Sequence, residues 1–159
     1  MSDATSYEEF LDANGSLTYT VVGVSMLPLL RQKKDLFVVK KKGDERCSVG
    51  DVVLFRRPPN KYVLHRVVKV LPDSYETMGD NCISRERGVM EDDILGVMTS
   101  FVRNGKQHSV DDRGYRFYTY VWMHSTRARV LVKKAESALR RRVKKVFIKC
   151  GIPLPNQKG

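Results

Sequence analysis

Between residues 17 and 103, the apolar positions of the chain gather in short runs that turn residues separate. The runs are rich in β-branched and aromatic residues, which is typical of strands. Breaks such as Pro58-Pro59 and Asn104-Gly105 interrupt them, and the Asn-Gly pair tolerates the positive φ that tight turns require. The expected strands are Leu17–Val24, Leu36–Lys41, Val52–Arg56, Tyr62–Leu71, Tyr75–Met78 and Leu95–Arg103.

A short helix is expected before these strands. Ser6 and Glu9 have the spacing of a capping box, and Asn14-Gly15 has the composition of a helix stop. We therefore predict one helix over about Ser6–Ala13. With strands making up most of the chain that follows, the predicted fold class is mainly β.

The pattern becomes helical again near the other end, because residues 115–150 contain neither Gly nor Pro. Tyr115, Tyr118 and Trp122 fall on one helical face, which we expect to pack on the β region. A second helix is predicted after Ser125-Thr126, with basic residues outside a single apolar stripe. The stripe comprises Ala128, Leu131, Val132, Ala135, Ala138, Leu139, Val143, Val146 and Phe147.

The positive charge of the chain is concentrated in this second helix. The formal net charge is +11, and residues 126–149 hold ten Lys or Arg and one Glu, which is +9 of that total. The remaining sequence is nearly balanced, so we interpret the chain as a near-neutral body with a basic appendage. Such an appendage suits an anionic partner, either a membrane surface or nucleic acid.

Neither a metal site nor a membrane-spanning segment is predicted. Cys47, Cys82 and Cys150 lack the spacing of metal ligands, and we interpret them as reduced thiols. The apolar stretch Val21–Leu30 has ten residues, whereas a spanning helix needs roughly 20. The acidic first residues do not resemble a signal peptide. We expect a cytoplasmic protein with no transmembrane helix, no metal and no cofactor.

A serine and a histidine stand in otherwise apolar segments. Ser25 lies in GVSMLPLL and His65 in YVLHRVVKV. A serine hydroxyl is a poor nucleophile until a base removes its proton, and histidine, with a pKa near neutrality, is the usual base. Each residue alone has an explanation without chemistry: Ser25 as a tolerated polar group at a strand end, and His65 as a half-buried histidine bonded to a backbone carbonyl.

Five segments, taken in order, favour chemistry. They are GVSMLPLL, VGDVVLFR, VLHRVVKV, TMGDNC and DILGVM. Over about residues 20–100 they resemble the type I signal peptidase superfamily, specifically its endoplasmic-reticulum, archaeal and sporulation-type branch. That branch has a Ser-Met-x-Pro box with the nucleophile, a His-Arg box with the base, and a Gly-Asp-Asn box. The resemblance implies a coiled, barrel-like antiparallel β-sheet peptidase fold, in a soluble member without the membrane anchor of that branch.

The resemblance also implies residue roles. Ser25 would be the nucleophile, and His65 the general base that later protonates the leaving amine. The Ser25 N–H would face the developing oxyanion. Gly23 would let the substrate backbone approach, and Met26 would border the same site and pack beneath it. Small substrate side chains before the cut are implied as well.

The acidic partner of His65 stays open at this point. Asp80, in the GDN box, could orient His65 or could be a turn residue that caps its own backbone. In the related peptidases a further aspartate follows this box, and here the nearest acid is Glu86. Either Glu86 replaces that aspartate, or the enzyme works mainly as a Ser-His dyad.

Together these features predict a serine endopeptidase that removes a leader or signal segment from a peptide or protein precursor through an acyl-enzyme. Residues 1–110 would form the peptidase domain and residues 111–159 a basic helical extension. The helix over 126–149 could lie on an anionic membrane surface at the inner face, or be a solvated face docked on the body. A third reading has the enzyme act on soluble precursors.

Two alternatives belong to other classes. One is a pseudo-peptidase that binds extended peptides without cutting them. The other is a nucleic-acid-binding regulator that uses the basic helix. Nucleic acid is the less expected partner, because no helix-turn-helix pattern precedes the strands.

Overall fold

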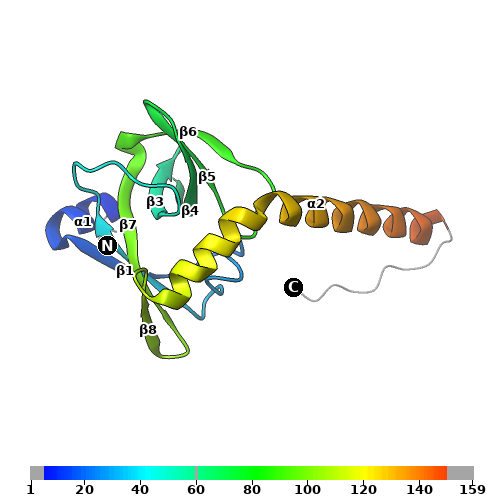
Figure 1. Ribbon diagram of the computed structural model, residues 1–159, viewed down its shortest axis with the longest axis horizontal. Helices are drawn as coiled ribbons and strands as arrows, with labels where there is room; N and C mark the ends of the chain where they lie inside the picture. The colour runs from blue at the N-terminus through cyan, green and yellow to red at the C-terminus, as the bar shows by residue number, and fades with distance from the viewer. Residues whose placement is uncertain (1–5, 60, 150–159) are drawn as a thin grey trace, which may run out of the picture. The chain divides into compact units, whose positions relative to one another are not determined.

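The structure is a computed structural model, and it describes residues 6–59 and 61–149, without the side chains of 127, 134, 137, 140 and 143–149. Short strands predominate, with one helix before them and one after them (Figure 1). The elements are α1 (Tyr7–Asn14), β1 (Ser16–Thr20), β2 (Leu36–Lys41), β3 (Val52–Arg57), β4 (Lys61–Val70), β5 (Ser74–Met78), β6 (Glu86–Met90), the 3-10 turn η1 (Glu91–Asp93), β7 (Ile94–Arg103), β8 (Lys106–Ser109) and α2 (Arg113–Lys149).

The strands form one antiparallel sheet in the order β1-β2-β7-β3-β4-β5-β6, with β8 paired to β7. This confirms the predicted mainly β fold class with a short helix before it and a helical segment after it. The sheet is open, because β1 and β6 stand at the two ends of this order and do not pair. The implied barrel is therefore not closed in the described part of the chain.

Helix α1 (Tyr7–Asn14) lies within one residue of the predicted Ser6–Ala13 at each end. The Ser6 side chain accepts a hydrogen bond from the Glu9 N–H, and the Glu9 carboxylate accepts one from the Ser6 N–H. Gly15 closes the helix at φ 72°, a left-handed conformation that glycine adopts at little cost. The capping box thus makes Ser6 the N-cap, and the helix begins at the next residue, Tyr7.

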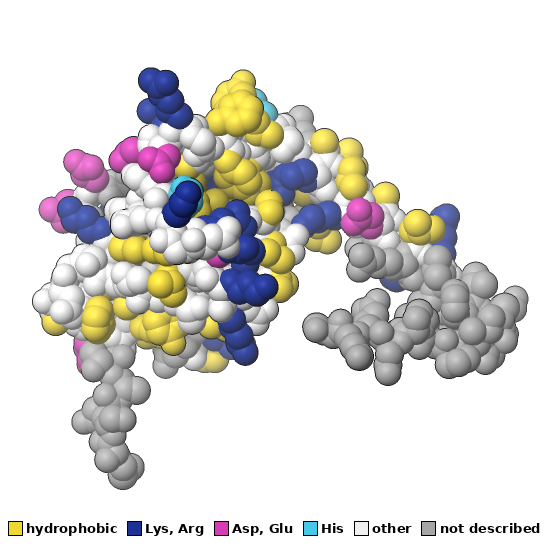
Figure 2. Space-filling view, turned by 90° about the horizontal axis from the view of Figure 1, so that it is seen from below, with side chains coloured by type: hydrophobic (Ala, Val, Ile, Leu, Met, Phe, Trp, Pro, Cys, Tyr) yellow, Lys and Arg dark blue, Asp and Glu magenta, His cyan; other side chains and the backbone are white. Residues whose placement is uncertain are grey.

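Helix α2 is continuous where two helices were predicted, because Ser125-Thr126 does not interrupt it. The chain divides into two compact units at this point, one ending at His124 and the other beginning at Ser125. The predicted boundary at 110/111 lies before this division between the two units. The first turns of α2 belong to the first unit, because they pack with the sheet and bury Trp122. Along the outer part of α2 (residues 125–149), described side chains of both hydrophobic and basic residues reach the surface (Figure 2).

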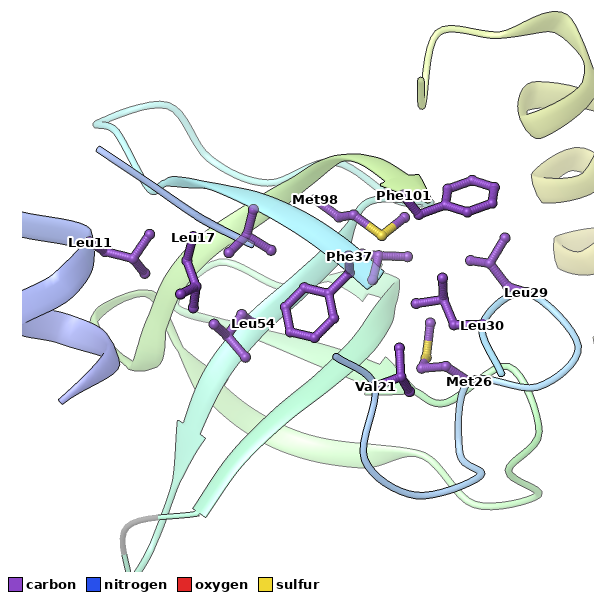
Figure 3. Packing of buried hydrophobic residues seen from close by; sticks show 12 residues of the cluster. Leu11, Leu17, Val21, Met26, Leu29, Leu30, Phe37, Leu54, Met98 and Phe101 are labelled. Carbon is purple, nitrogen blue, oxygen red and sulfur yellow. The ribbon is translucent and has the colours of Figure 1, made fainter. Parts of the chain in front are cut away.

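The hydrophobic core lies between the strands of the sheet and the loop that follows β1. One end is filled from α1 and β1 by Leu11 and Leu17, and Val21 and Met26 of the loop lie together at the other end (Figure 3). The predicted strand Leu17–Val24 is too long, because the chain leaves the sheet after Thr20. Within the described residues, no helix has the length and apolar character needed to cross a membrane.

Candidate active site

Ser25 lies in a tight turn after β1, and buried neighbours hold this turn in place. Met26 and Leu30 are fully buried, and the Leu30 N–H donates to the Met26 carbonyl at 2.9 Å. Gly23, two residues before the serine, has φ +88°, and a Cβ built on it would meet no atom within 4 Å. The turn therefore leaves Ser25 half-buried, while its neighbour Met26 packs into the core.

The GDN segment holds the serine turn through hydrogen bonds to the carbonyl groups of the turn. The Asn81 N–H donates to the Ser25 carbonyl at 2.7 Å, and Asn81 Nδ2 donates to the Val24 carbonyl at 3.1 Å. A Cβ built on Gly79 would lie 2.7 Å from the Ser25 carbonyl oxygen and 3.0 Å from His65 Nε2. Both atoms thus border the same small volume, which remains open because residue 79 is a glycine.

His65 lies on β4, and its side chain points toward this volume with Nε2. The residue is 8% exposed, and burial lowers its pKa below the ordinary value. The charges of Glu86 and Asp80 act in the opposite direction, while that of Arg57 adds to the lowering. A buried histidine with a lowered pKa is neutral near pH 7, and the neutral imidazole is the form that can accept a proton.

Glu86 is the acid that the structure brings beside the other ring nitrogen. Its Oε2 lies 3.7 Å from His65 Nδ1, which has no hydrogen-bond partner among the described residues. Arg57, at the end of β3, binds both Glu86 oxygens, with Nε donating to Oε1 at 2.5 Å and Nη2 to Oε2. A carboxylate held in this way stands next to the nitrogen that becomes charged when His65 takes up a proton.

Asp80 has a different environment. Its two carboxylate oxygens accept hydrogen bonds from Arg66 Nε at 3.0 Å and Arg66 Nη2 at 2.9 Å, and Tyr118 donates to Oδ2 at 2.8 Å. Trp122 Nε1 donates to the Asp80 carbonyl at 3.2 Å. Asp80 therefore joins the GDN segment to β4 and α2, a contact that the motif alone does not reveal.

A pocket of about 790 Å³ connects these features. Its lining includes Ser25, His65 and Glu86, and continues to Arg57 and Cys82. The sequence did not indicate Arg57, because an arginine at a strand end has no motif, nor Cys82, which looks like an ordinary thiol. Gly79 and Asn81 could have been found, since both flank Asp80 in the GDN segment.

No group of three or more His, Cys, Asp or Glu side chains is placed to hold a metal ion in the residues that the structure describes. Comparisons with protein-family models, curated proteins and solved structures find no match to this chain. Function is therefore inferred from the geometry around Ser25 and His65.

Proposed function

We propose that the protein is a serine endopeptidase that cleaves a leader or signal segment from a peptide or protein precursor. The observation that supports this most is the shared pocket, which both Ser25 and His65 line although 39 residues separate them in the sequence. The order of the sequence motifs and the lowered pKa of His65 support the same assignment.

In this mechanism His65 Nε2 removes the Ser25 hydroxyl proton as Oγ attacks the scissile carbonyl carbon. The Glu86 carboxylate stabilises the imidazolium that results. His65 then gives the proton to the leaving amine, and the C–N bond breaks to leave an ester on Ser25. A water molecule, deprotonated by His65, hydrolyses the ester and restores the serine.

The oxyanion of each tetrahedral intermediate needs a hydrogen-bond donor. The Ser25 N–H makes no hydrogen bond within the described residues, and it belongs to the residue whose hydroxyl attacks the substrate in this mechanism. Gly23 supplies no side-chain donor. We assign stabilisation of the oxyanion to the Ser25 N–H, an interaction that typically lowers the activation barrier by about 3 kcal/mol.

The substrate backbone has two strand edges available beside the pocket. Strand β1 is at one end of the sheet and pairs only with β2. Strand β4 pairs with β3 along its length to Arg66, but with β5 only from Arg66 onward, so Lys61–His65 has one open edge in the described ladders. An extended peptide placed here would gain main-chain hydrogen bonds on the way to Ser25.

The test is a peptidase assay of the wild type beside Ser25→Ala and His65→Ala, with a library of internally quenched peptides. A fluorophosphonate should add to the wild type at Ser25, as mass spectrometry of the digested protein would show, and should not add to Ser25→Ala. Cleavage that persists undiminished in Ser25→Ala would overturn the mechanism. Peptide binding without any turnover would favour the pseudo-peptidase.

We further propose that the outer part of α2 binds an anionic membrane surface, which would place the protein in the cytoplasm and peripherally at the inner membrane face. Leu131 and Leu139 are 68% and 63% exposed, on a helix that carries most of the net positive charge of the chain. An amphipathic cationic helix of this kind binds at the lipid headgroup boundary. The side chains of Val143, Val146 and Phe147, also predicted in the apolar stripe, lie outside the described residues.

A further inference from the structure

We infer that the pocket contains a subsite for a bulky apolar side chain of the substrate, about three residues from the scissile bond. The inference rests on the proposed peptidase function and adds a substrate preference to it. At this one position it departs from the small side chains before the cut that the resemblance implies. It concerns a region away from Ser25, where three tyrosines form one wall.

The wall consists of Tyr7 from α1, Tyr19 from β1 and Tyr62 from β4. The ring of Tyr7 lies 4.5 Å from that of Tyr62 and 5.2 Å from that of Tyr19, measured between centroids. All three line the same pocket as Ser25 and His65. Elements far apart in the sequence thus place aromatic surface at one end of the candidate active site.

The position of this wall follows from the strand spacing. Tyr62 precedes His65 by three residues on β4, and a strand rises about 3.3 Å per residue, which gives about 10 Å. An extended substrate that runs along the open edge of β4 covers this length with three residues. The side chain that reaches the tyrosines therefore belongs to a residue about three positions from the bond that Ser25 attacks.

The two faces of β4 differ beside this edge. Tyr62 and Leu64 pack against the core cluster that contains Leu54, whereas Val63 packs against a second cluster on the other face. His65 shares the face of Val63 by strand alternation. A substrate strand alternates in the same way, so its side chains meet the apolar wall at every second position and the catalytic face at the others.

A large apolar side chain suits the wall better than a small one. Tyr19 is 42% exposed, on the same strand face as buried Leu17, so its ring offers surface that an occupant would cover. Burial raises the pKa of Tyr7, with a further contribution from Tyr19, so this phenol is neutral at physiological pH. Aromatic and branched aliphatic side chains gain most from such contacts, while an alanine leaves the wall uncovered.

The experiment uses the full chain and a cleaved peptide in which each position near the cut is varied among Ala, Leu and Phe. We expect kcat/KM to be at least about tenfold higher for Phe or Leu than for Ala at one position about three residues from the cut, the scale of a hydrophobic pocket. Tyr19→Ala should remove this preference mainly through KM, Tyr19→Phe should retain it, and Tyr120→Ala, an exposed tyrosine outside the pocket, should leave it unchanged. Cleavage with no such preference, or a preference that survives Tyr19→Ala, would overturn the subsite.

A binding measurement separates this inference from the proposed function. The Ser25→Ala protein should bind the Phe peptide more tightly than the matched Ala peptide, as fluorescence anisotropy would show, whether or not the wild type cleaves either one. Equal affinities would overturn the subsite. Tighter binding of the Phe peptide in a protein that never cleaves would retain the subsite and reject the peptidase.

Discussion

Arg57 binds both oxygens of Glu86, while Oε2 of the same carboxylate lies 3.7 Å from His65 Nδ1. The two charges act on His65 in opposite directions, since Glu86 raises its pKa and Arg57 adds to the lowering that burial causes. In the proposed mechanism Arg57 is thus a positioning residue, which fixes the Glu86 carboxylate and opposes its effect on the pKa of His65. The sequence left the choice between Asp80 and Glu86 open, and this geometry favours Glu86.

The pH dependence of cleavage tests this arrangement. His65 must be neutral to act as the base, so kcat/KM should rise with pH through the pKa of His65. Glu86→Gln removes a charge that raises this pKa, so the acidic limb should move to lower pH, with the rate reduced by about tenfold or more because the imidazolium loses its partner. Arg57→Gln should move the limb to higher pH. Arg87→Gln, the same charge change at an exposed arginine that binds Glu76, should leave the limb in place, and a shift of both test variants in one direction would contradict the assignment.

Cys82 is a second residue that the sequence did not mark. A Cβ built on Gly79 would lie 2.8 Å from Cys82 Sγ as well as 3.0 Å from His65 Nε2, so the thiol borders the candidate active site. Cys47 is buried instead, and burial raises its pKa to about 11, which suppresses the reactive thiolate.

If the protein has the proposed activity, N-ethylmaleimide should therefore inactivate it through Cys82. With Cys150→Ser as the background, we expect one adduct per chain, on Cys82, and loss of more than about 90% of activity because the adduct fills the pocket. Cys82→Ser should keep its activity under the same treatment. Activity that survives complete modification of Cys82 would show that this thiol lies outside the path of the substrate.

The bounds of five strands agree with the predicted ones to within one residue at either end. These strands are β2, β3, β4, β5 and β7. Strands β6 and β8 were missed, because ERGVM and KQHS contain too few apolar residues to produce a strand pattern, and their pairing depends on neighbours distant in sequence. The predicted first strand was too long, because an apolar run alone does not distinguish a strand from a buried turn. The residues Met26 and Leu30 are apolar because they fill the core below the serine turn.

The contact between this turn and the GDN segment gives a prediction about Gly79. A side chain there would collide with the Ser25 carbonyl oxygen, which is a backbone atom and cannot move without displacing Ser25, the proposed nucleophile. Gly79→Ala should lower kcat/KM by about 100-fold, since small displacements of catalytic groups have effects of that size. Gly43→Ala is the matched control, because a Cβ there meets no atom within 4 Å and its φ is not positive. Equal activity of both variants would refute the close approach of the two segments.

The buried ion pair between Arg66 and Asp80 connects the candidate site to the rest of the first compact unit. Both side chains are fully buried, and Arg66 also donates to the Gly50 carbonyl at 2.7 Å and to the hydroxyls of Tyr115 and Thr119 on α2. The predicted packing of the Tyr115, Tyr118 and Trp122 face is confirmed by these contacts. The sequence could place that face on the sheet, but it could not show that a buried ion pair beneath the helix makes the contact.

Removing the charge of Asp80 should therefore change stability. Asp80→Asn leaves the Arg66 guanidinium buried without its counterion, and we expect the free energy of unfolding to fall by about 3–5 kcal/mol, as urea denaturation followed by circular dichroism would measure. Glu86→Gln should cost less than about 1 kcal/mol, because that carboxylate is partly exposed to solvent. An Asp80→Asn protein of unchanged stability but shifted pH profile would instead assign the orientation of His65 to Asp80.

The charge distribution of the chain leads to a prediction about membranes. Flotation with vesicles should recover the wild type with anionic phosphatidylglycerol vesicles and not with zwitterionic phosphatidylcholine vesicles, and binding should weaken as salt rises. Leu131→Asp with Leu139→Asp removes apolar surface and two units of positive net charge, so it should abolish flotation. Gln32→Asp with Ser48→Asp makes the same change in net charge on exposed residues of the first unit, and should reduce flotation much less. If both double variants float equally well, the outer part of α2 does not bind the membrane through its apolar stripe, and its charges act only as a solvated surface.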